Sequence, residues 1–300
     1  MAERVFFLVT VDGDLRVGTT AQQKAGVRAM REVHARLGLR GKTSWMINEL
    51  DFEWTEKHPD LLLDLAHSGE CIGVHDHLDT YFAESYEDIF PLMQRSRSRL
   101  MTCLSSEDIE PARFLTAHRN GCAMQSEPSY QAAIDLGYSI VSDVRPELVW
   151  WARMVKVEGM PNSWRALEEG DPRAVCTDNR RIPLPALPWR HGADNWLETT
   201  SREGPLTHIP VTCLPWLERD RVEAAIEGNR EEAFVLLDTH PYDLQDPGSG
   251  EISEERVDSY QRALEGVIED YHPTFIRLDQ AAYYSAQRLE GIQHSNEAGI

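Results

Sequence analysis

Cysteine is scarce in this chain of 300 residues, which has only five. They are scattered along the sequence, and no two of them form a Cys-x-x-Cys pair. An odd number of cysteines without regular spacing argues against a disulfide framework. Reduced thiols are typical of proteins in a reducing compartment, so this pattern favours a cytoplasmic protein.

Long hydrophobic runs are also missing. The first residues, MAERVFFLVTVDGD, contain one short apolar stretch that meets Asp12 at once. This stretch is too short to span a bilayer, and it carries no signal-peptide pattern. We therefore expect no membrane association, and a cytoplasmic location is the simplest interpretation.

Positive charge is in short supply. The chain has 30 Lys and Arg residues against 50 Asp and Glu residues, which gives a formal net charge of −20. Nucleic-acid binding depends on neutralising phosphates with clustered basic side chains, and no long basic stretch offsets the acidic field here. We expect no nucleic-acid partner, whereas the sequence allows for a homo-oligomer.

What the sequence does contain is an alternation of short apolar runs and longer amphipathic segments. Strands are predicted at residues 4–11, 42–48, 70–77, 114–121 and 138–144, and helices at 20–39, 58–69, 86–104 and 126–137. This alternation predicts an α/β protein with a parallel sheet or a (β/α) barrel.

The middle of the chain, residues 145–205, breaks this regularity. It is rich in proline, tryptophan and arginine and shows no clear period, so we expect an irregular, loop-rich insert. Regular patterns return at 206–215, 231–244, 253–270 and 274–278. We expect a single domain over residues 1–288 that includes the insert, and a flexible tail over residues 289–300.

Polar groups of an unusual kind stand at the ends of four predicted strands. They are Asp12 and Asp14, then His75, His77 and Asp79, then His118 and Arg119, and finally His240 and Asp243. In α/β barrels the functional residues gather at the carboxyl ends of the strands. Two imidazoles and a carboxylate suit zinc or a similar divalent ion and leave a position open for water.

The Asp12-Gly13-Asp14 segment fits the same chemistry. A bound divalent ion lowers the pKa of its water toward neutrality, and a nearby carboxylate can accept the proton. One aspartate would then hold the ion while the other serves as base. The alternative is that Asp-Gly-Asp merely forms a turn, for which it is well suited.

Several segments resemble the polysaccharide deacetylase family, the NodB-homology group of carbohydrate esterases. TVDGD at residues 10–14 resembles the first motif, with one residue inserted between the aspartates. The similar segments that follow are HPDLLLDLAHSGECIGVH, HRNG with SYQAAIDLGYSIVSDV, and LLDTHPYDL. The resemblance runs in order from about residue 5 to 280, and leaves only 145–205 unmatched.

The resemblance implies a distorted (β/α) barrel of about seven strands with its site at the carboxyl strand ends. It also implies a metal-dependent hydrolase, most simply a zinc enzyme, that removes an acyl group such as N-acetyl from an amino sugar or related glycan. By position, Asp12 would be the general base and His240 the general acid. Arg119 would keep Asp12 ionised, and Asp14 and His75 would bind the metal.

The chain departs from the family pattern at the second metal histidine, which usually stands four residues after the first. That position is Asp79 here, and His77 stands two residues after His75 instead. If this segment is extended, His75 and His77 project to the same side. If it is helical, Asp79 comes level with His75. We favour His77 as the ligand and keep Asp79 as the alternative.

Two other functions stay open. Members of the same superfamily hydrolyse ureides or cyclic amides, some without metal, and a non-catalytic carbohydrate-binding barrel is the third interpretation. In every case the expected partner is a small molecule or glycan. We expect His118, next to Arg119, to form a wall of the site or to contact substrate rather than bind metal.

Overall fold

The computed structural model describes residues 2–15, 18–81, 83–105, 109, 114–151, 154–156, 164–166, 176–184, 186–192, 195–214 and 217–290. Much of the predicted insert and residues 291–300 of the predicted tail lie outside these ranges. None of the described helices is both long and apolar enough to cross a membrane.

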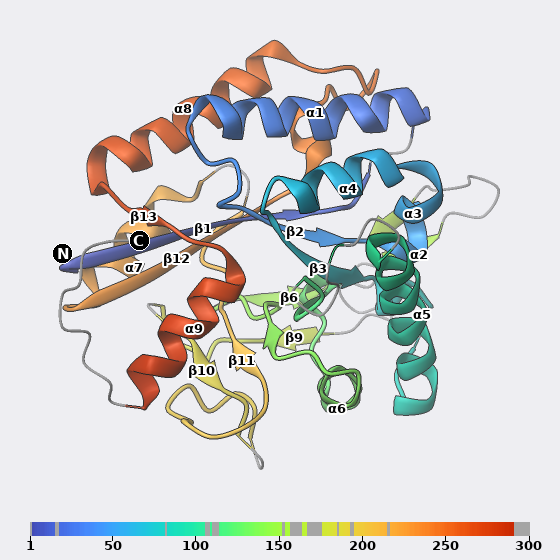
Figure 1. The fold of residues 1–300 in the computed structure, drawn as a ribbon. Coiled ribbons are helices and arrows are strands. Elements are labelled where there is room, and N and C mark those ends of the chain that lie inside the picture. The colour runs from blue at the N-terminus through green and yellow to red at the C-terminus, as the bar shows by residue number, and fades with distance from the viewer. Residues whose placement is uncertain are drawn as a thin grey trace.

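The centre of the molecule is a nine-stranded sheet in the order β10-β11-β5-β4-β3-β2-β1-β12, with β13 paired to β1 (Figure 1). Seven consecutive strands, from β11 to β12, pair in parallel, and β10 is antiparallel to β11. This confirms the predicted distorted (β/α) barrel. The strands are β1 (Arg4–Asp12), β2 (Ser44–Ile47), β3 (Cys71–Asp76), β4 (Ala117–Asn120), β5 (Ile140–Val141), β10 (Trp189–Arg190), β11 (Thr207–His208), β12 (Glu232–Thr239) and β13 (Thr274–Phe275).

Helices surround this sheet, and α1 and α8 lie side by side on one side of β1 (Figure 1). The helices are α1 (Thr20–Arg36), α2 (Glu49–Phe52), α3 (Trp54–Lys57), α4 (Pro59–His67), α5 (Tyr86–Ser105), α6 (Glu127–Asp135), α7 (Arg219–Glu227), α8 (Glu254–Tyr271) and α9 (Leu278–Leu289). Three short 3-10 turns, η1 (Leu78–Tyr81), η3 (Gly121–Ala123) and η4 (Pro241–Leu244), follow the ends of β3, β4 and β12.

The described part of residues 145–205 contains short antiparallel pairs beside the main sheet. β6 (Val149–Trp151) pairs with β9 (Cys176–Asp178), and β7 (Met154–Lys156) pairs with β8 (Trp164–Ala166). The strand predicted at 138–144 is reduced to the two-residue β5, and the regular segment 206–215 contains the two-residue β11. An apolar run indicates burial, but it does not fix how many residues a strand pairs.

The side chains of β1 alternate between two cores. Phe7, Val9 and Val11 belong to the cluster that also contains Val27 and Met30 of α1. Phe6 and Leu8 belong to a second cluster, which collects Met46 of β2, Ala117 of β4 and Leu236 of β12. Because successive strand side chains point to opposite faces, every second residue of these strands points into the barrel.

Buried histidines between the helices give the fold a specific sensitivity to acid. His34 of α1 is buried, and its Nε2 lies 2.9 Å from the Tyr260 hydroxyl of α8. Burial, helped by Arg31, lowers the pKa of His34 to about 3. In the unfolded chain His34 binds a proton near pH 6.5, whereas in the folded chain it stays neutral down to about pH 3. The contribution of neutral His34 to the free energy of unfolding is therefore complete above pH 6.5 and falls as the pH drops toward 3.

We therefore expect unfolding by urea to show a loss of about 2 kcal/mol of stability between pH 7 and pH 5 that His34 accounts for. The His34→Gln variant should lose stability less steeply over this interval, whatever its absolute stability at pH 7. An unchanged pH slope in the variant would show that His34 does not carry this effect.

Candidate metal and acid–base site

The alternation of strand side chains brings four polar groups to one end of the barrel interior. Asp12 continues the inward row of Phe6 and Leu8 at the end of β1, and Asp238 continues the row of Phe234 and Leu236. His75 and Arg119 are register partners on the adjacent strands β3 and β4. Parallel strands place their carboxyl ends at the same edge, so residues far apart in the sequence meet here.

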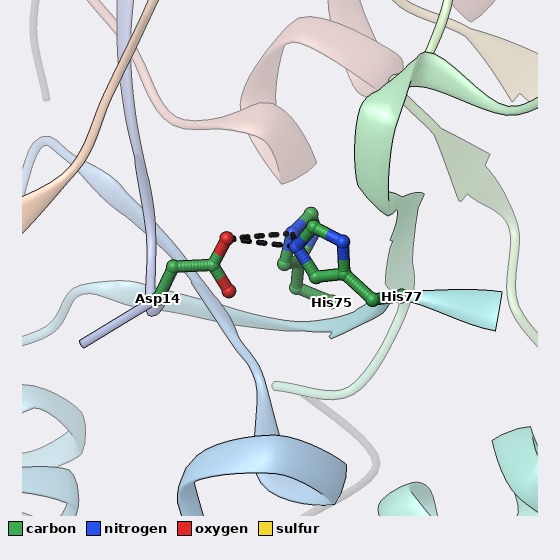
Figure 2. A group of neighbouring side chains, drawn as sticks. All are labelled: Asp14, His75 and His77. Atoms are coloured by element: carbon green, nitrogen blue, oxygen red, sulfur yellow. Dashed lines mark hydrogen bonds and ion pairs between the residues drawn. The ribbon is translucent and has the colours of Figure 1, made fainter. Parts of the chain in front are cut away.

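Asp14, His75 and His77 form a compact group at this edge, and Figure 2 shows the Asp14 carboxylate facing both rings. Asp14 Oδ2 lies 2.8 Å from His77 Nε2 and 3.5 Å from His75 Nε2. The two Nε2 atoms are 3.2 Å apart. Ligands at about 2.0 Å from a tetrahedral zinc lie about 3.3 Å from one another, so this spacing fits one divalent cation.

The second oxygen of Asp14 is held by a residue that the sequence analysis did not identify. Asn48, directly after β2, donates from Nδ2 to Asp14 Oδ1 at 2.7 Å, which leaves Oδ2 toward the histidines. Burial raises the pKa of Asp14, but His77 and His75 outweigh it and hold this pKa well below its usual range. Asp14 is therefore ionised, as a metal ligand must be.

The structure brings His77, and not Asp79, into this group. His75 lies in extended β3, and His77 follows directly, so both rings project to the same side as in an extended segment. Asp79 lies in η1, and its Oδ1 is 3.5 Å from His77 Nδ1, on the opposite edge of the ring from Asp14. These positions favour His77 as the third ligand over the alternative.

Gly121 of the HRNG segment provides the space for His77. A Cβ atom at this position would lie 2.3 Å from His77 Nδ1, which is far inside van der Waals contact. We expect Gly121→Ala to displace the ring and to weaken metal binding by about 10- to 100-fold, as loss of supporting contacts around metal ligands does.

Competition with a chromophoric chelator measures this affinity. Gly137→Ala is a useful comparison, because a Cβ there meets nothing within 4 Å, although its φ of +79° makes that variant strained in its own loop. Equal metal affinity in Gly121→Ala and the wild type would contradict the positioning of His77 by this close approach.

Asp12 lies next to the group of Asp14, His75 and His77 but is held by a different partner. Arg119 NH1 donates to Asp12 Oδ1 at 2.8 Å and also to Asp238 Oδ1. The same guanidinium is fixed by Ser142, through its carbonyl at 2.6 Å and its hydroxyl at 2.9 Å. Burial lowers the pKa of Arg119, but Asp12 and Asp238 raise it overall, so the guanidinium stays charged. Oδ2 of Asp12 lies 3.7 Å from His75 Nε2.

His240 lies on the next element beside Asp12. It follows β12 directly, and its Nε2 lies 4.0 Å from Asp12 Oδ2. Asp243 Oδ2 accepts the His240 backbone N–H at 2.7 Å and lies 3.3 Å from the ring Nδ1. Burial lowers the pKa of His240, but Asp243, Asp238 and Asp12 raise it to about 10. His240 is therefore a proton donor at neutral pH.

This pairing predicts the alkaline side of a pH–rate profile. The protonated form of His240 is lost as the pH rises toward about 10, so activity that needs this proton falls there. In Asp243→Asn the negative charge is gone, and the alkaline limb of kcat/KM should move down by about 1 to 3 pH units. An alkaline limb that stays in place would show that His240 does not supply the proton.

One expectation about the site is wrong. His118 does not line it, because in β4 it points away from the side that Arg119 faces. Its Nε2 lies 3.2 Å from Asp76 Oδ2, and Asp76 accepts a further hydrogen bond from Ser96 of α5. All three side chains are buried, so His118 belongs to the packing between sheet and helix.

Sequence comparisons identify no relative: no family model matches the chain, and no curated protein matches it. Comparison of the fold with solved structures does find similar proteins. A "putative polysaccharide deacetylase" from Mycobacterium smegmatis is similar at a TM-score of 0.59 and 12% identity, over 100% of this chain and 96% of that one. A 4-alpha-glucanotransferase from Thermococcus litoralis is similar at 0.54 and 12%, over 94% of this chain and 40% of that one. At such low identity these likenesses show the fold and not the reaction.

Proposed function

We propose that this chain is a metal-dependent hydrolase of the polysaccharide deacetylase kind, which removes an acyl group, N-acetyl in the simplest case, from an amino sugar or a related glycan. The fold is compatible with more than one chemistry, so the proposal depends on the residues of the site. One observation carries it: the group of Asp14, His75 and His77 lies beside Asp12, a carboxylate outside that group, and Asp12 Oδ2 lies 3.7 Å from His75 Nε2 and 4.0 Å from His240 Nε2.

Asp14, His75 and His77 would hold the metal. We favour zinc, because two imidazoles and one carboxylate leave a tetrahedral ion one open position. When bound, such an ion supplies a Lewis acid that makes a water nucleophilic near neutral pH and polarises the substrate carbonyl. The remaining steps belong to the side chains around it.

Asp12 would accept the proton of the attacking water. Its Oδ1 is engaged by Arg119, whereas Oδ2 faces the metal-binding group and His240. The hydrogen bond from Arg119 fixes the orientation of the carboxylate, so that Oδ2 stays toward the site. Asp12 is nine-tenths or more buried, and this protects the proton transfer from bulk water.

His240 would give a proton to the departing nitrogen. Its Nε2 faces Asp12, whose Oδ2 is 4.0 Å away, and its Nδ1 faces Asp243, whose Oδ2 is 3.3 Å away. A hydrogen bond from Nδ1–H to the Asp243 carboxylate orients the ring and keeps it protonated until Nε2 donates. Proton acceptance and proton donation are thus assigned to two neighbouring side chains, whose Oδ2 and Nε2 atoms are 4.0 Å apart.

The direct test measures acetate release from a panel of N-acetylated amino sugars and short glycans, before and after removal of metal with a chelator. The proposal requires release by the metal-loaded protein and recovery of the lost activity when zinc is added back. Full activity after complete metal removal would favour the metal-independent ureide or cyclic-amide chemistry. Tight glycan binding without any product would favour the non-catalytic interpretation.

A further inference from the structure

The ring of His77 has a second group of polar side chains along its other edge. Its Nε2 faces Asp14 and His75, whereas its Nδ1 lies 3.5 Å from Asp79 Oδ1. One donor atom from each of His77, Asp79 and Cys122 lies within 4.8 Å of the others. An imidazole nitrogen, a carboxylate oxygen and a thiol sulfur form a donor set that zinc and cobalt accept readily.

The distance between the imidazole and the carboxylate is compatible with a shared cation. Nδ1 and Oδ1 lie 3.5 Å apart, and two ligands of one tetrahedral zinc lie about 3.3 Å apart. Asp79 is completely buried, and a buried carboxylate is stabilised by positive charge nearby.

The backbone that carries Cys122 adopts an uncommon conformation. Cys122 has φ 54° and Ala123 has φ 50°, so two consecutive residues other than glycine are left-handed in the turn η3. Such residues cost free energy and tend to cluster where a structure holds a functional group in place. Here the turn follows Gly121, whose missing Cβ allows the His77 ring to lie against it, and it places the thiol beside that ring.

We propose that His77 Nδ1, Asp79 and Cys122 bind a second divalent cation of the zinc type, with the imidazole of His77 bridging the two ions. Ligation needs the thiolate and the doubly deprotonated ring, so the thiol and Nδ1–H each release one proton to solvent. A cation on Nε2 makes the Nδ1 proton more acidic, which couples the second ion to the first. The inference goes beyond the proposed function but shares His77 with it.

Cobalt(II) tests this site, because a thiolate bound to cobalt absorbs strongly in the near ultraviolet and other ligands do not. Protein stripped with a chelator should take up about two cobalt ions per chain, with this absorption developing during the titration. Cys122→Ser should bind about one ion and lose the near-ultraviolet band while keeping the visible cobalt spectrum. Cys103→Ser, which changes a half-buried thiol of α5, is the matched control and should behave like the wild type.

Asp14→Asn separates the two sites. It weakens the first ion, but a neutral His77 ring that keeps its proton on Nε2 can still bind the second ion through Nδ1, so the thiolate band should remain. The second site is overturned if the wild type binds about one ion without this band, or if the band disappears in Asp14→Asn because a single ion holds both sets. In either case the proposed function survives. No cobalt uptake by the wild type at all would overturn both.

Discussion

Replacing Asp12 with asparagine is expected to lower kcat by about 10²–10⁴-fold while the metal content stays at the wild-type level. The amide is nearly isosteric and keeps a carbonyl oxygen for Arg119, whose NH1 donates to Asp12 Oδ1 at 2.8 Å. It cannot accept a proton at neutral pH. The defect should therefore lie in turnover and not in assembly of the site.

Metal analysis and steady-state kinetics on the same preparation measure this result. Asp238→Asn is the informative control. Asp238 also accepts a hydrogen bond from Arg119 NH1, but Asp12 is the carboxylate whose Oδ2 lies 3.7 Å from His75 Nε2. This control variant should lose less activity, since the Asp12 carboxylate remains in place. Near-wild-type kcat in Asp12→Asn would remove Asp12 from the role of base.

The second large effect is expected from His77→Ala. Loss of one of three ligands should release the metal of the Asp14 group and lower activity by about 10³-fold, to the level of chelator-treated protein, because the Lewis acid supplies several kcal/mol of transition-state stabilisation. Asp79→Ala leaves Asp14, His75 and His77 in place, and we expect it to retain that ion and most of the activity.

Metal content after gel filtration, together with activity on the same acetylated substrate, compares the two variants. The opposite order, with Asp79→Ala losing metal and His77→Ala keeping it, would assign the third ligand to Asp79. That outcome would require the 75–79 segment to be rearranged relative to the structure described above.

The sequence predicts the strand ends of this site well, and the reason is geometric. Period-2 alternation places Asp12, His75 and Arg119 on one face of their strands, and parallel pairing brings those ends together. The same rule could have excluded His118, which is one residue before Arg119 and so faces the helices. Its polarity and its place near a strand end are features that it shares with the residues of the site.

The supporting contacts are harder to predict because they depend on distances across the fold. Asn48 stands at the end of a predicted strand, so its position was available from the same strand-end reasoning, but nothing local shows that it binds Asp14 Oδ1. The double contact of Arg119 with Asp12 and Asp238 joins residues more than one hundred positions apart. The choice between His77 and Asp79 depends on whether the chain stays extended after β3 or turns into a helix. The sequence of this segment is compatible with either conformation.

The central claim is that one cation is held by Asp14, His75 and His77 while Asp12 stands beside it unligated. X-ray diffraction from zinc-loaded crystals, with anomalous data collected at the zinc edge, tests it directly. The account predicts an anomalous peak about 2.0–2.2 Å from Asp14 Oδ2 and from the Nε2 atoms of His75 and His77, with Asp12 outside ligand distance. A peak coordinated by Asp12 in place of Asp14, or no peak among these three side chains, would contradict it.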